Sequence, residues 1–211
     1  MPAARPRPRV RMDGPRRRDQ ILAAATALIS ERGYWGLSTQ DVADACEMTV
    51  PGVLHHVGSK TGLLVAVLER RDELDAHAIA DRLGVPHGDG RGIWGTDLFT
   101  AAGVTLDVLC DHLVQHNATQ PEVVRLYAVL EAESLTPDHP AHTYFAERQR
   151  TALVALAAVV PPPHDPDHLA SVALGLMDGL QLQWLRDPAT SLVDRWRAAV
   201  ADVPGLRLPS A

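Results

Sequence analysis

Residues 38–60, STQDVADACEMTVPGVLHHVGSK, decide the fold of this 211-residue chain. Ser38 stands three residues before Asp41, which is the spacing of a capping box at the start of a helix. Thr49 is placed to cap a further helix, and Pro51 is tolerated there because an N–H in the first turn has no intrahelical acceptor. The stretch therefore predicts two short helices separated by a tight turn.

The flanking sequence completes a helix-turn-helix pattern. Before the quoted stretch, one helix face is formed by Ile21, Leu22, Ala25, Leu28 and Ile29. Gly33 is expected to end that helix, and Ser59 to cap a longer one that runs to about Leu83. Three short helices followed by a long one are typical of a DNA-binding domain whose third helix enters the major groove.

The rest of the chain also shows helical periodicity. Residues 84–92 contain four glycines and one proline and are expected to form a loop. Beyond them, apolar residues recur at helical spacing, with proline-containing breaks between them, in Leu98–Gln115, Val123–Leu135, Tyr144–Val160, Leu169–Leu185 and Leu192–Val200. No alternating strand pattern or internal repeat is evident. The sequence therefore predicts an all-α fold of about nine helices.

Composition narrows the class of protein. The content of hydrophobic residues is 46% and that of charged residues 22%, as in an ordinary globular protein. Two widely spaced cysteines, Cys46 and Cys110, do not suggest a disulfide framework. No apolar stretch fits a signal peptide or a membrane span, so we expect a cytoplasmic protein.

Charge is unevenly distributed along the chain. Residues 1–71 hold eleven Arg or Lys against seven Asp or Glu, whereas residues 72–211 hold nine against nineteen. A basic N-terminal part on an acidic body is typical of a nucleic-acid-binding protein with a separate regulatory part. A merely solvated basic tail would show the same imbalance.

Residues 16–71 resemble the DNA-binding domain of the tetracycline-repressor (TetR) family. The resemblance lies in the first helix ending at Arg32-Gly33 and in 37–39 (LST), 41–43 (DVA) and 54–60 (LHHVGSK). Two positions depart from the family pattern. Glu47 stands where the turn usually has glycine, so the turn is expected to be strained if its φ is positive, and Leu54 replaces an aromatic residue.

The resemblance and the chemistry of the third helix together suggest the residues that bind DNA. Thr49, His55 and His56 have polar atoms for phosphates or base edges, whereas Val50, Pro51 and Gly52 offer apolar surface that suits thymine methyl groups. Phosphate contacts are expected from Thr39, Lys60 and the basic run Arg16, Arg17 and Arg18. The alternatives are an inward-packed core histidine at position 55 or 56 and a merely solvated Lys60.

Residues 93–203 resemble the family's C-terminal domain more loosely. The landmark is 173–185, ALGLMDGLQLQWL, followed by Asp187-Pro188, which in the family is the penultimate helix and pairs with the last helix in a four-helix dimer interface. The expected interface residues are Gly175, Gly179, Val193, Trp196 and Val200. A homodimer would present its two third helices to successive major grooves of a palindromic operator.

A pocket for a mainly hydrophobic small molecule is expected among the middle helices. Its candidate residues are Trp94, Phe99, Leu106, Cys110, Leu113, Tyr127, Leu130, Glu131, Met177, Gln181 and Trp184. For any single one of them, plain core is the alternative and the more common case. The family resemblance implies that a ligand shifts the linking helix and changes the spacing of the two DNA-binding heads.

The expected organisation is a disordered basic arm (1–15), a helix-turn-helix domain (16–61), a linking helix (62–83) and a ligand-binding and dimerisation domain (84–211). Rival interpretations are weaker. The pairs His112–His116 and His164–His168 have a spacing that metal ligands use, Cys110 could be a redox switch, and no nucleotide-binding or nucleophile motif suggests an enzyme. We therefore expect no metal, cofactor or catalysis. Two alternatives stay open: a DNA-binding protein without ligand control, and a helical small-molecule-binding protein or enzyme with a relic helix-turn-helix.

Overall fold

The computed structural model describes residues 14–87 and 96–208, and all regular structure within these ranges is helical. Its ten helices are α1 (Gly14–Arg32), α2 (Thr39–Ala45), α3 (Val50–Val57), α4 (Lys60–Leu83), α5 (Thr96–Ala101), α6 (Leu106–Ala118), α7 (Pro121–Ser134), α8 (His142–Ala158), α9 (Pro166–Arg186) and α10 (Leu192–Val200). The predicted all-α class is confirmed. The predicted basic arm comprises residues 1–15. Residues 1–13 lie outside the described residues, and residues 14 and 15 belong to α1.

The ends of the early helices follow the capping chemistry of the sequence. Ser38 and Asp41 form the predicted capping box, in which the Ser38 hydroxyl accepts from the Asp41 N–H and the Asp41 carboxylate accepts from the Ser38 N–H. The side chains of Thr49 and Ser59 likewise accept from the N–H of the third residue of α3 and α4, Gly52 and Gly62. Each helix start is thus fixed locally, as the sequence predicts.

The expected single helix over residues 98–115 is two helices. Gly103 takes a φ of +69°, and the Val104 N–H donates to the Phe99 carbonyl, which ends α5. Thr105 then precedes α6. This extra break is why the described residues hold ten helices where about nine were expected.

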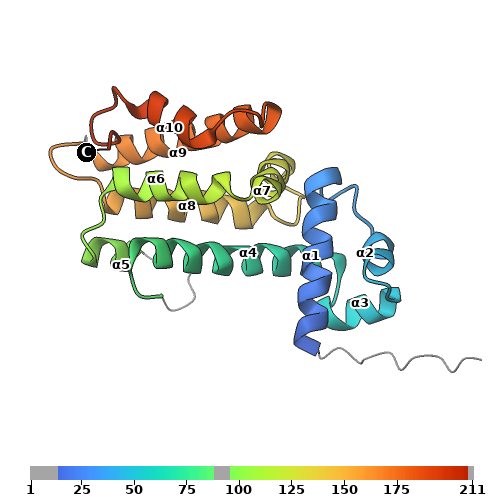
Figure 1. The fold of residues 1–211 in the computed structure, drawn as a ribbon. Coiled ribbons are helices and arrows are strands. Elements are labelled where there is room, and N and C mark those ends of the chain that lie inside the picture. The colour runs from blue at the N-terminus through green and yellow to red at the C-terminus, as the bar shows by residue number, and fades with distance from the viewer. Residues whose placement is uncertain (1–13, 88–95, 209–211) are drawn as a thin grey trace, which may run out of the picture.

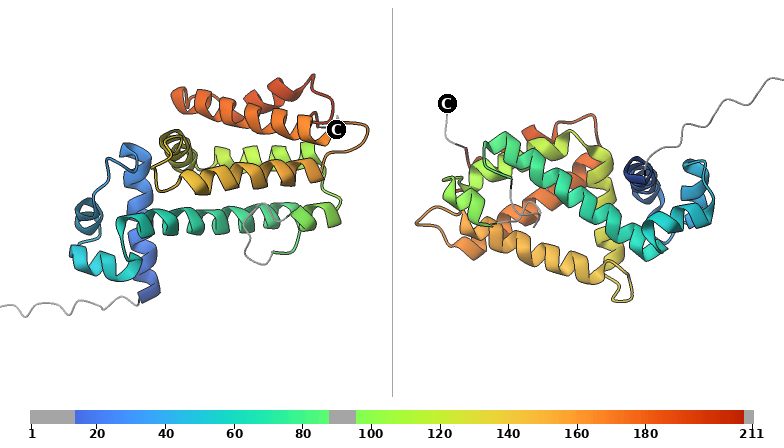
Figure 2. Two further views of the ribbon diagram at one scale, coloured as in Figure 1. Left: turned by 180° about the vertical axis from the view of Figure 1, so that it is seen from behind. Right: turned by 90° about the horizontal axis from the view of Figure 1, so that it is seen from below.

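The helices form a small and a larger lobe (Figure 1). Helices α1 to α3 make the smaller lobe, and α4 runs from it beneath the larger one. In the larger lobe α6 and α8 lie between α4 and the pair α9 and α10, an arrangement that the reverse view repeats (Figure 2). Helix α7 crosses these layers at the end that meets α1.

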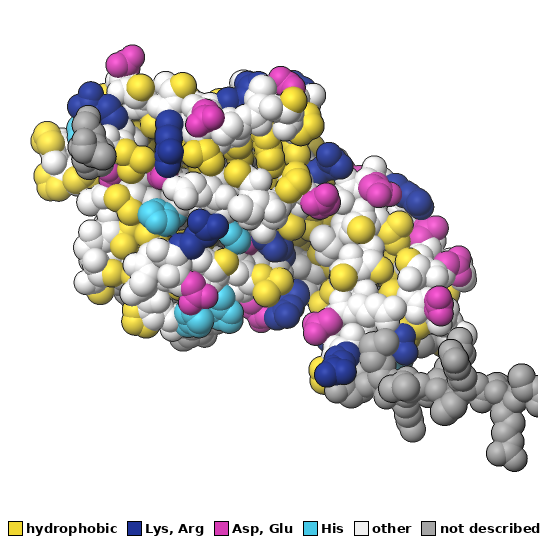
Figure 3. Space-filling view, viewed as in Figure 1, with side chains coloured by type: hydrophobic (Ala, Val, Ile, Leu, Met, Phe, Trp, Pro, Cys, Tyr) yellow, Lys and Arg dark blue, Asp and Glu magenta, His cyan; other side chains and the backbone are white. Residues whose placement is uncertain are grey.

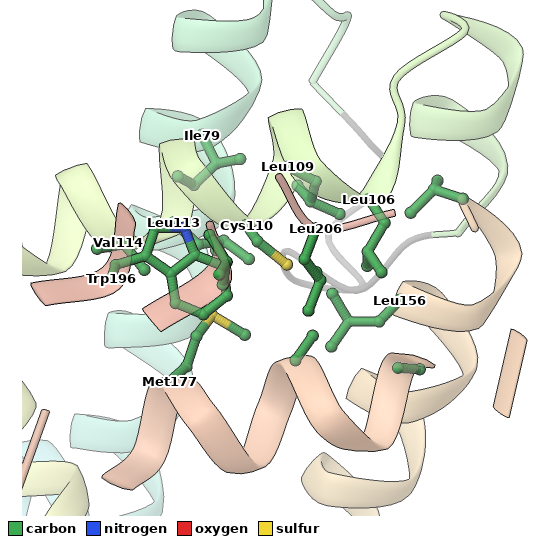
Figure 4. Close-up of a cluster of buried hydrophobic side chains, with 14 of the residues drawn as sticks. Ile79, Leu106, Leu109, Cys110, Leu113, Val114, Leu156, Met177, Trp196 and Leu206 are labelled. Atoms are coloured by element: carbon green, nitrogen blue, oxygen red, sulfur yellow. The ribbon is translucent and has the colours of Figure 1, made fainter. Parts of the chain in front are cut away.

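Two hydrophobic cores hold the lobes. The core of the larger lobe joins residues of α4, α6, α8, α9 and α10, including Ile79, Leu109, Leu156 and Trp196 (Figure 4). The other core lies around α1 to α3 and the first half of α4, but it also takes Leu126 and Leu130 from α7 and Ala141 and Phe145 from the start of α8. Helices α1 to α3 therefore share their core with the C-terminal half of the chain.

Candidate functional site

The surface of α3 presents the predicted residues to solvent. Val53 and Val57 anchor the helix in the core, while Thr49, Pro51 and His55 are exposed. Val50, Gly52 and His56 are partly exposed, and the rings of His55 and His56 meet edge to face with centroids 5.4 Å apart. Neither histidine is buried, so the alternative of an inward-packed core histidine is wrong. The exposed face combines small apolar groups with imidazole donors and acceptors.

Basic side chains flank α3 from two other helices. The Arg18 guanidinium on α1 donates to the His56 carbonyl at 2.9 Å and so satisfies a free carbonyl at the end of α3. Lys60, the first residue of α4, places its ammonium 4.4 Å from the centre of the Tyr34 ring. Arg16 is exposed near the start of α1, and Arg17 donates to Gln20. Positive charge therefore lies beside the C-terminal end of α3.

The turn between α2 and α3 has an unusual backbone. Glu47 takes a φ of +53°, and it is the non-glycine residue with positive φ within the described ranges. An L residue with a β-carbon pays a steric cost in this left-handed region. The strain foreseen from the sequence at Glu47 is thus present.

Helix α7 is attached to α1 by a polar contact as well as by its core residues. Gly33 ends α1, as predicted, with a φ of +72°, and the Tyr34 N–H donates to the Glu133 carboxylate at 2.7 Å. His139 is buried beside the rings of Tyr34 and Trp35, with centroids 5.1 and 5.4 Å away. Burial lowers the pKa of His139, against the opposing effect of Glu133.

A cavity of about 120 Å³ lies between α4, α6, α7, α8 and α9 and is partly open to solvent. Its wall consists of Asp72, Asp75, Leu113, His116, Asn117, Val123, Val124, Tyr127, Ala128, Glu131, Arg148, Leu174, Met177, Asp178, Gln181 and Leu182. Four of these are carboxylates and one is a guanidinium. The wall of the cavity therefore combines apolar side chains with more charged groups than the sequence suggested.

Asp72 on α4 accepts hydrogen bonds from α7 and α8 at the cavity wall. The Tyr127 hydroxyl donates to its Oδ1 at 2.7 Å, and the Tyr144 hydroxyl donates to its Oδ2. The Arg148 guanidinium lies 3.9 Å from the same carboxylate and 4.6 Å from the centre of the Tyr127 ring. Burial, together with the neighbouring negative charge of Asp72, raises the pKa of Tyr144.

Asp75, one turn further along α4, makes a second connection. Its Oδ1 accepts from Arg71, from the His116 ring of α6 at 2.6 Å, and from the Gln120 amide at 3.0 Å. Gln120 is also the residue that precedes α7, and it accepts from Arg71. The second half of α4 is thus held to α6, α7 and α8 by hydrogen bonds rather than by apolar packing alone.

Glu131 on α7 and Asp178 on α9 contribute charge without such partners. Within the described residues neither carboxylate has a hydrogen bond. Partial removal from water, reinforced by the facing Glu131 and opposed by Arg148, raises the pKa of Asp178 to about 6. The Asp178 side chain is nevertheless exposed to solvent where it lines the cavity.

The structure brings together only part of the predicted pocket. Leu113, Tyr127, Glu131, Met177 and Gln181 line the cavity. The remaining described candidates do not, because Phe99, Leu106, Cys110 and Trp184 are buried in the larger core and Leu130 in the core around α1. Cys110 and Leu106, for example, lie among apolar side chains (Figure 4). Trp94 lies outside the described residues.

Sequence reasoning missed the polar residues of the wall, above all Asp72, Asp75, His116, Arg148 and Asp178. Two carboxylates three residues apart on the linking helix were a usable signal, since they share a helix face. Arg148 and Asp178 had no such local signal. Their proximity arises from the packing of α8 and α9 against α7.

The residues expected at a dimer interface separate into two groups. Trp196 and Val200 are 0% and 2% exposed and pack in the larger core, because α10 folds back onto α6, where Arg197 pairs with the buried Asp111. The interface assignment of these two residues is therefore wrong. Gly175 is exposed and Gly179 partly so, and a β-carbon added to either would meet no atom within 4 Å. Val193 is partly buried against the core.

The rival metal and redox sites gain no support from the described geometry. His116 bonds to Asp75, whereas His112 bonds to the Val108 carbonyl within its own helix. Within residues 14–87 and 96–208, no three His, Cys, Asp or Glu side chains gather as a metal site would need. Burial raises the pKa of the Cys110 thiol, which disfavours the reactive thiolate. None of the described helices is long and apolar enough to cross a membrane.

Comparison with known proteins gives a match to the family described as bacterial regulatory proteins, tetR family, over residues 21–67. No curated protein matches the chain. Solved structures share the fold. A transcriptional regulator of Saccharomonospora viridis in complex with choline has a TM-score of 0.64 at 21% identity, with 89% of this chain and 95% of the other covered.

Two further structures show the same fold over most of the chain. NalD of Pseudomonas aeruginosa, the secondary repressor of the MexAB-OprM multidrug efflux pump, has a TM-score of 0.62 at 21% identity and covers 90% of this chain and 95% of its own. The transcriptional regulator FadR of Bacillus subtilis, in complex with stearoyl-CoA, has a TM-score of 0.62 at 13% identity and covers 83% and 91%. The matched residues 21–67 include α2, α3 and most of α1. They therefore contain α3, whose exposed surface is described above.

Proposed function

The chain belongs to the tetR family of bacterial regulatory proteins, and from that premise we propose that it is a cytoplasmic homodimeric repressor that a small molecule releases from a palindromic operator. One observation carries this proposal. Helices α4 and α7 each contribute residues to the core of the DNA-binding helices and other residues to the wall of the cavity. A ligand in the cavity would therefore touch the helices that position α3.

The proposed DNA contact uses α3 in the major groove. Pro51 and His55 lie on its exposed face, and we expect Lys60 and Arg16 to contact phosphates. We keep the proposal that the apolar part of this face favours thymine methyl groups. Arg18 has a different proposed role, since its bond to the His56 carbonyl holds α3 against α1.

The proposed dimer forms through α9 and its neighbour α8 rather than through α10. Gly175 leaves an open place on α9, and Leu182 and Val154 are 45% and 53% exposed. Figure 3 shows hydrophobic side chains at the surface of the upper part of the larger lobe, where α9 and α10 lie. A second copy of the same face would cover these groups, as a two-fold interface requires.

The oligomeric state tests this surface directly. Gly175→Arg places a long charged side chain in open space on α9, so it should block dimerisation without disturbing the fold. Ala132→Arg on the exposed side of α7 is the matched control. Sedimentation should give a dimer for the control and a monomer for Gly175→Arg, whereas a dimer in both would contradict the proposed interface.

The proposed release follows from the polar wall of the cavity. A ligand in the cavity lies beside Asp72 and Asp75 and can weaken the bonds that hold the second half of α4 to α6, α7 and α8. Solved regulators with this fold hold choline or stearoyl-CoA, which supports control by a ligand. A cavity open to solvent weighs against a constitutive DNA-binding protein.

DNA binding is tested by selecting bound sequences from a random library and measuring their affinity by fluorescence anisotropy over a range of salt. We expect palindromic sites that contain thymine, about tenfold weaker binding for His55→Ala, and a salt slope smaller by about 1 for Lys60→Ala. Arg207→Ala, which removes an exposed charge far along the chain, should change neither quantity. Absence of sequence-selective binding by the wild type would refute the repressor proposal.

A further inference from the structure

The charge of the cavity wall points to the class of molecule that it takes. Its four carboxylates face one guanidinium, that of Arg148, which already lies against Asp72 and over the Tyr127 ring. An anionic ligand would have to displace these contacts and approach the remaining carboxylates. Such a cavity repels anions and favours cations.

The four carboxylates are not equivalent. Those of Asp72 and Asp75 are occupied by donors from their own chain, as described above. Glu131 and Asp178 face each other from α7 and α9, and the described residues offer neither of them a hydrogen-bond donor. Two carboxylates without a hydrogen bond among the described residues therefore lie between α7 and α9, and the positive charge of Arg148 offsets them only in part.

The rest of the wall limits the size and shape of the ligand. Leu113, Val124, Leu174 and Met177 provide apolar contacts deeper in the cavity. The volume of about 120 Å³ is close to the roughly 150 Å³ of a protein cavity that takes up benzene. A single ring or a short alkyl chain fits this space, with its charged end toward the two free carboxylates.

We propose that the cavity binds a small organic cation, an amine or quaternary ammonium on a compact apolar body, whose charge is met by Glu131 and Asp178. This inference rests on the proposed function, in which the same cavity receives the effector. It goes further by naming the chemical class and the residues that select it. Opposite charge at the mouth and apolar contacts inside account for both ends of such a molecule.

The first experiment compares three probes of nearly equal size on the full chain without DNA. Benzylammonium, benzyl alcohol and benzoate differ in charge and share the ring, so calorimetric titration at pH 7.5 isolates the charge preference. We expect benzylammonium to bind at least tenfold more tightly than benzyl alcohol and benzoate not to bind measurably. Equal affinity for the three probes, or a preference for benzoate, would overturn the proposal.

Two variants assign the preference to the named carboxylates. Glu131→Gln with Asp178→Asn removes both charges at nearly constant size and should reduce benzylammonium affinity at least tenfold while leaving benzyl alcohol unchanged. Asp138→Asn, an exposed carboxylate outside the cavity, is the matched control and should bind like the wild type. Undiminished cation binding by the double variant, with its thermal unfolding still cooperative, would also overturn the proposal.

The pH dependence gives an independent readout. A cation favours the ionised form of Asp178, so its affinity should rise about tenfold from pH 5 to pH 7, in line with a pKa of about 6 in the free protein. Other groups at the cavity are Asp72 and Asp75 on α4, His116 on α6, Tyr127 and Glu131 on α7, and Arg148 on α8. Asp178→Asn should abolish the rise and His116→Gln should keep it, whereas the reverse would contradict the assignment.

This test separates the inference from the proposed function. Selective cation binding without any effect on operator affinity would support the cavity assignment and refute release by that ligand class. Release of DNA by a different class of molecule, with no cation preference in the cavity, would support the proposed function and refute the cavity assignment.

Discussion

The two halves of α4 are held in different ways. The first half packs through Leu63, Leu64 and Leu68, which are at most 1% exposed in the core around α1. The second half packs through Ile79 and is held in addition by Asp72 and Asp75, whose partners come from α6, α7, α8 and the residue before α7. A charged or polar ligand does not compete with apolar packing. It can, however, replace the donors that bond to a carboxylate. A single helix thus combines a rigid attachment to the DNA-binding helices with a replaceable one at the cavity.

Helix α7 shows the same division across its two faces. Leu126 and Leu130 are fully buried against the DNA-binding helices, whereas Tyr127 and Glu131, the next residues along, line the cavity. Three of the four predictions below test the attachment of α7 to α1, and the fourth tests the turn within the DNA-binding helices. They are ordered from the largest expected effect to the smallest.

Leu130→Ala should cost about 2–5 kcal/mol of unfolding free energy, because it removes a fully buried side chain and leaves a cavity in the shared core. Urea unfolding followed by circular dichroism measures the loss. Leu135→Ala removes the same side chain at a position that is 79% exposed and should cost less than about 0.5 kcal/mol. Similar losses for the two variants would mean that α7 is not part of the core around α1.

Gly33→Ala tests the polar contact between α1 and α7. The new β-carbon would lie 2.1 Å from the Glu133 carboxylate, at a φ of +72° that also disfavours alanine. We expect a loss of roughly 2–3 kcal/mol, from backbone strain together with the displaced bond to Tyr34. Gly84→Ala, at a φ of +65° with no atom within 4 Å, isolates the backbone cost and should lose only about 1 kcal/mol.

His139 should make the same junction sensitive to acid. Its pKa is lowered in the folded chain, so the unfolded chain takes up the proton first, near pH 6.5, and stability falls as the pH drops from that value toward the folded pKa. The slope can reach at most ~1.4 kcal/mol per pH unit for one proton. Unfolding free energies at pH 7.5, 6.5 and 5.5 should show a smaller decline for His139→Asn. Parallel curves for variant and wild type would contradict the prediction.

Glu47→Gly should stabilise the protein by about 0.5–1 kcal/mol. Glycine relieves the strain at a φ of +53°, although its greater freedom in the unfolded chain offsets part of the gain. Thermal unfolding at constant pH measures the difference. An exposed neighbour with ordinary φ, Asp44→Gly within α2, should instead lower the stability, since glycine is a poor helix former. A loss of stability in Glu47→Gly would mean that the turn carries no strain.

The sequence was informative where structure depends on local chemistry. The caps at Ser38, Thr49 and Ser59, the glycine at position 33 and the strained turn at Glu47 all follow from interactions within a few residues, and each is found where it was predicted. The break at Gly103 also had a local signal, but the apolar periodicity on both sides masked it.

The cavity could not be predicted in this way, because its wall is assembled from five helices that are distant in sequence. Aromatic and apolar side chains at helical spacing look the same whether they face a cavity or a core, and Phe99, Cys110 and Trp184 proved to be core. The same ambiguity affected Trp196, which was expected at the dimer surface. It is buried because α10 folds onto α6, a contact that the local sequence does not reveal. Charged residues on inner helix faces, such as Asp72 and Asp75, would have been the better guide.

The core that α7 and α8 share with α1 to α3 restricts how this regulator can be recombined. A chimera joined after Leu83, with the sensing half of another regulator, would lose Leu126, Leu130, Ala141 and Phe145 from beneath its own DNA-binding helices. If the transplanted half did not supply matching side chains at these four positions, a cavity would be left in the core at the junction. In this chain the C-terminal half is not an interchangeable module, and substitutions at the cavity wall would disturb the shared core less than an exchange at the domain boundary.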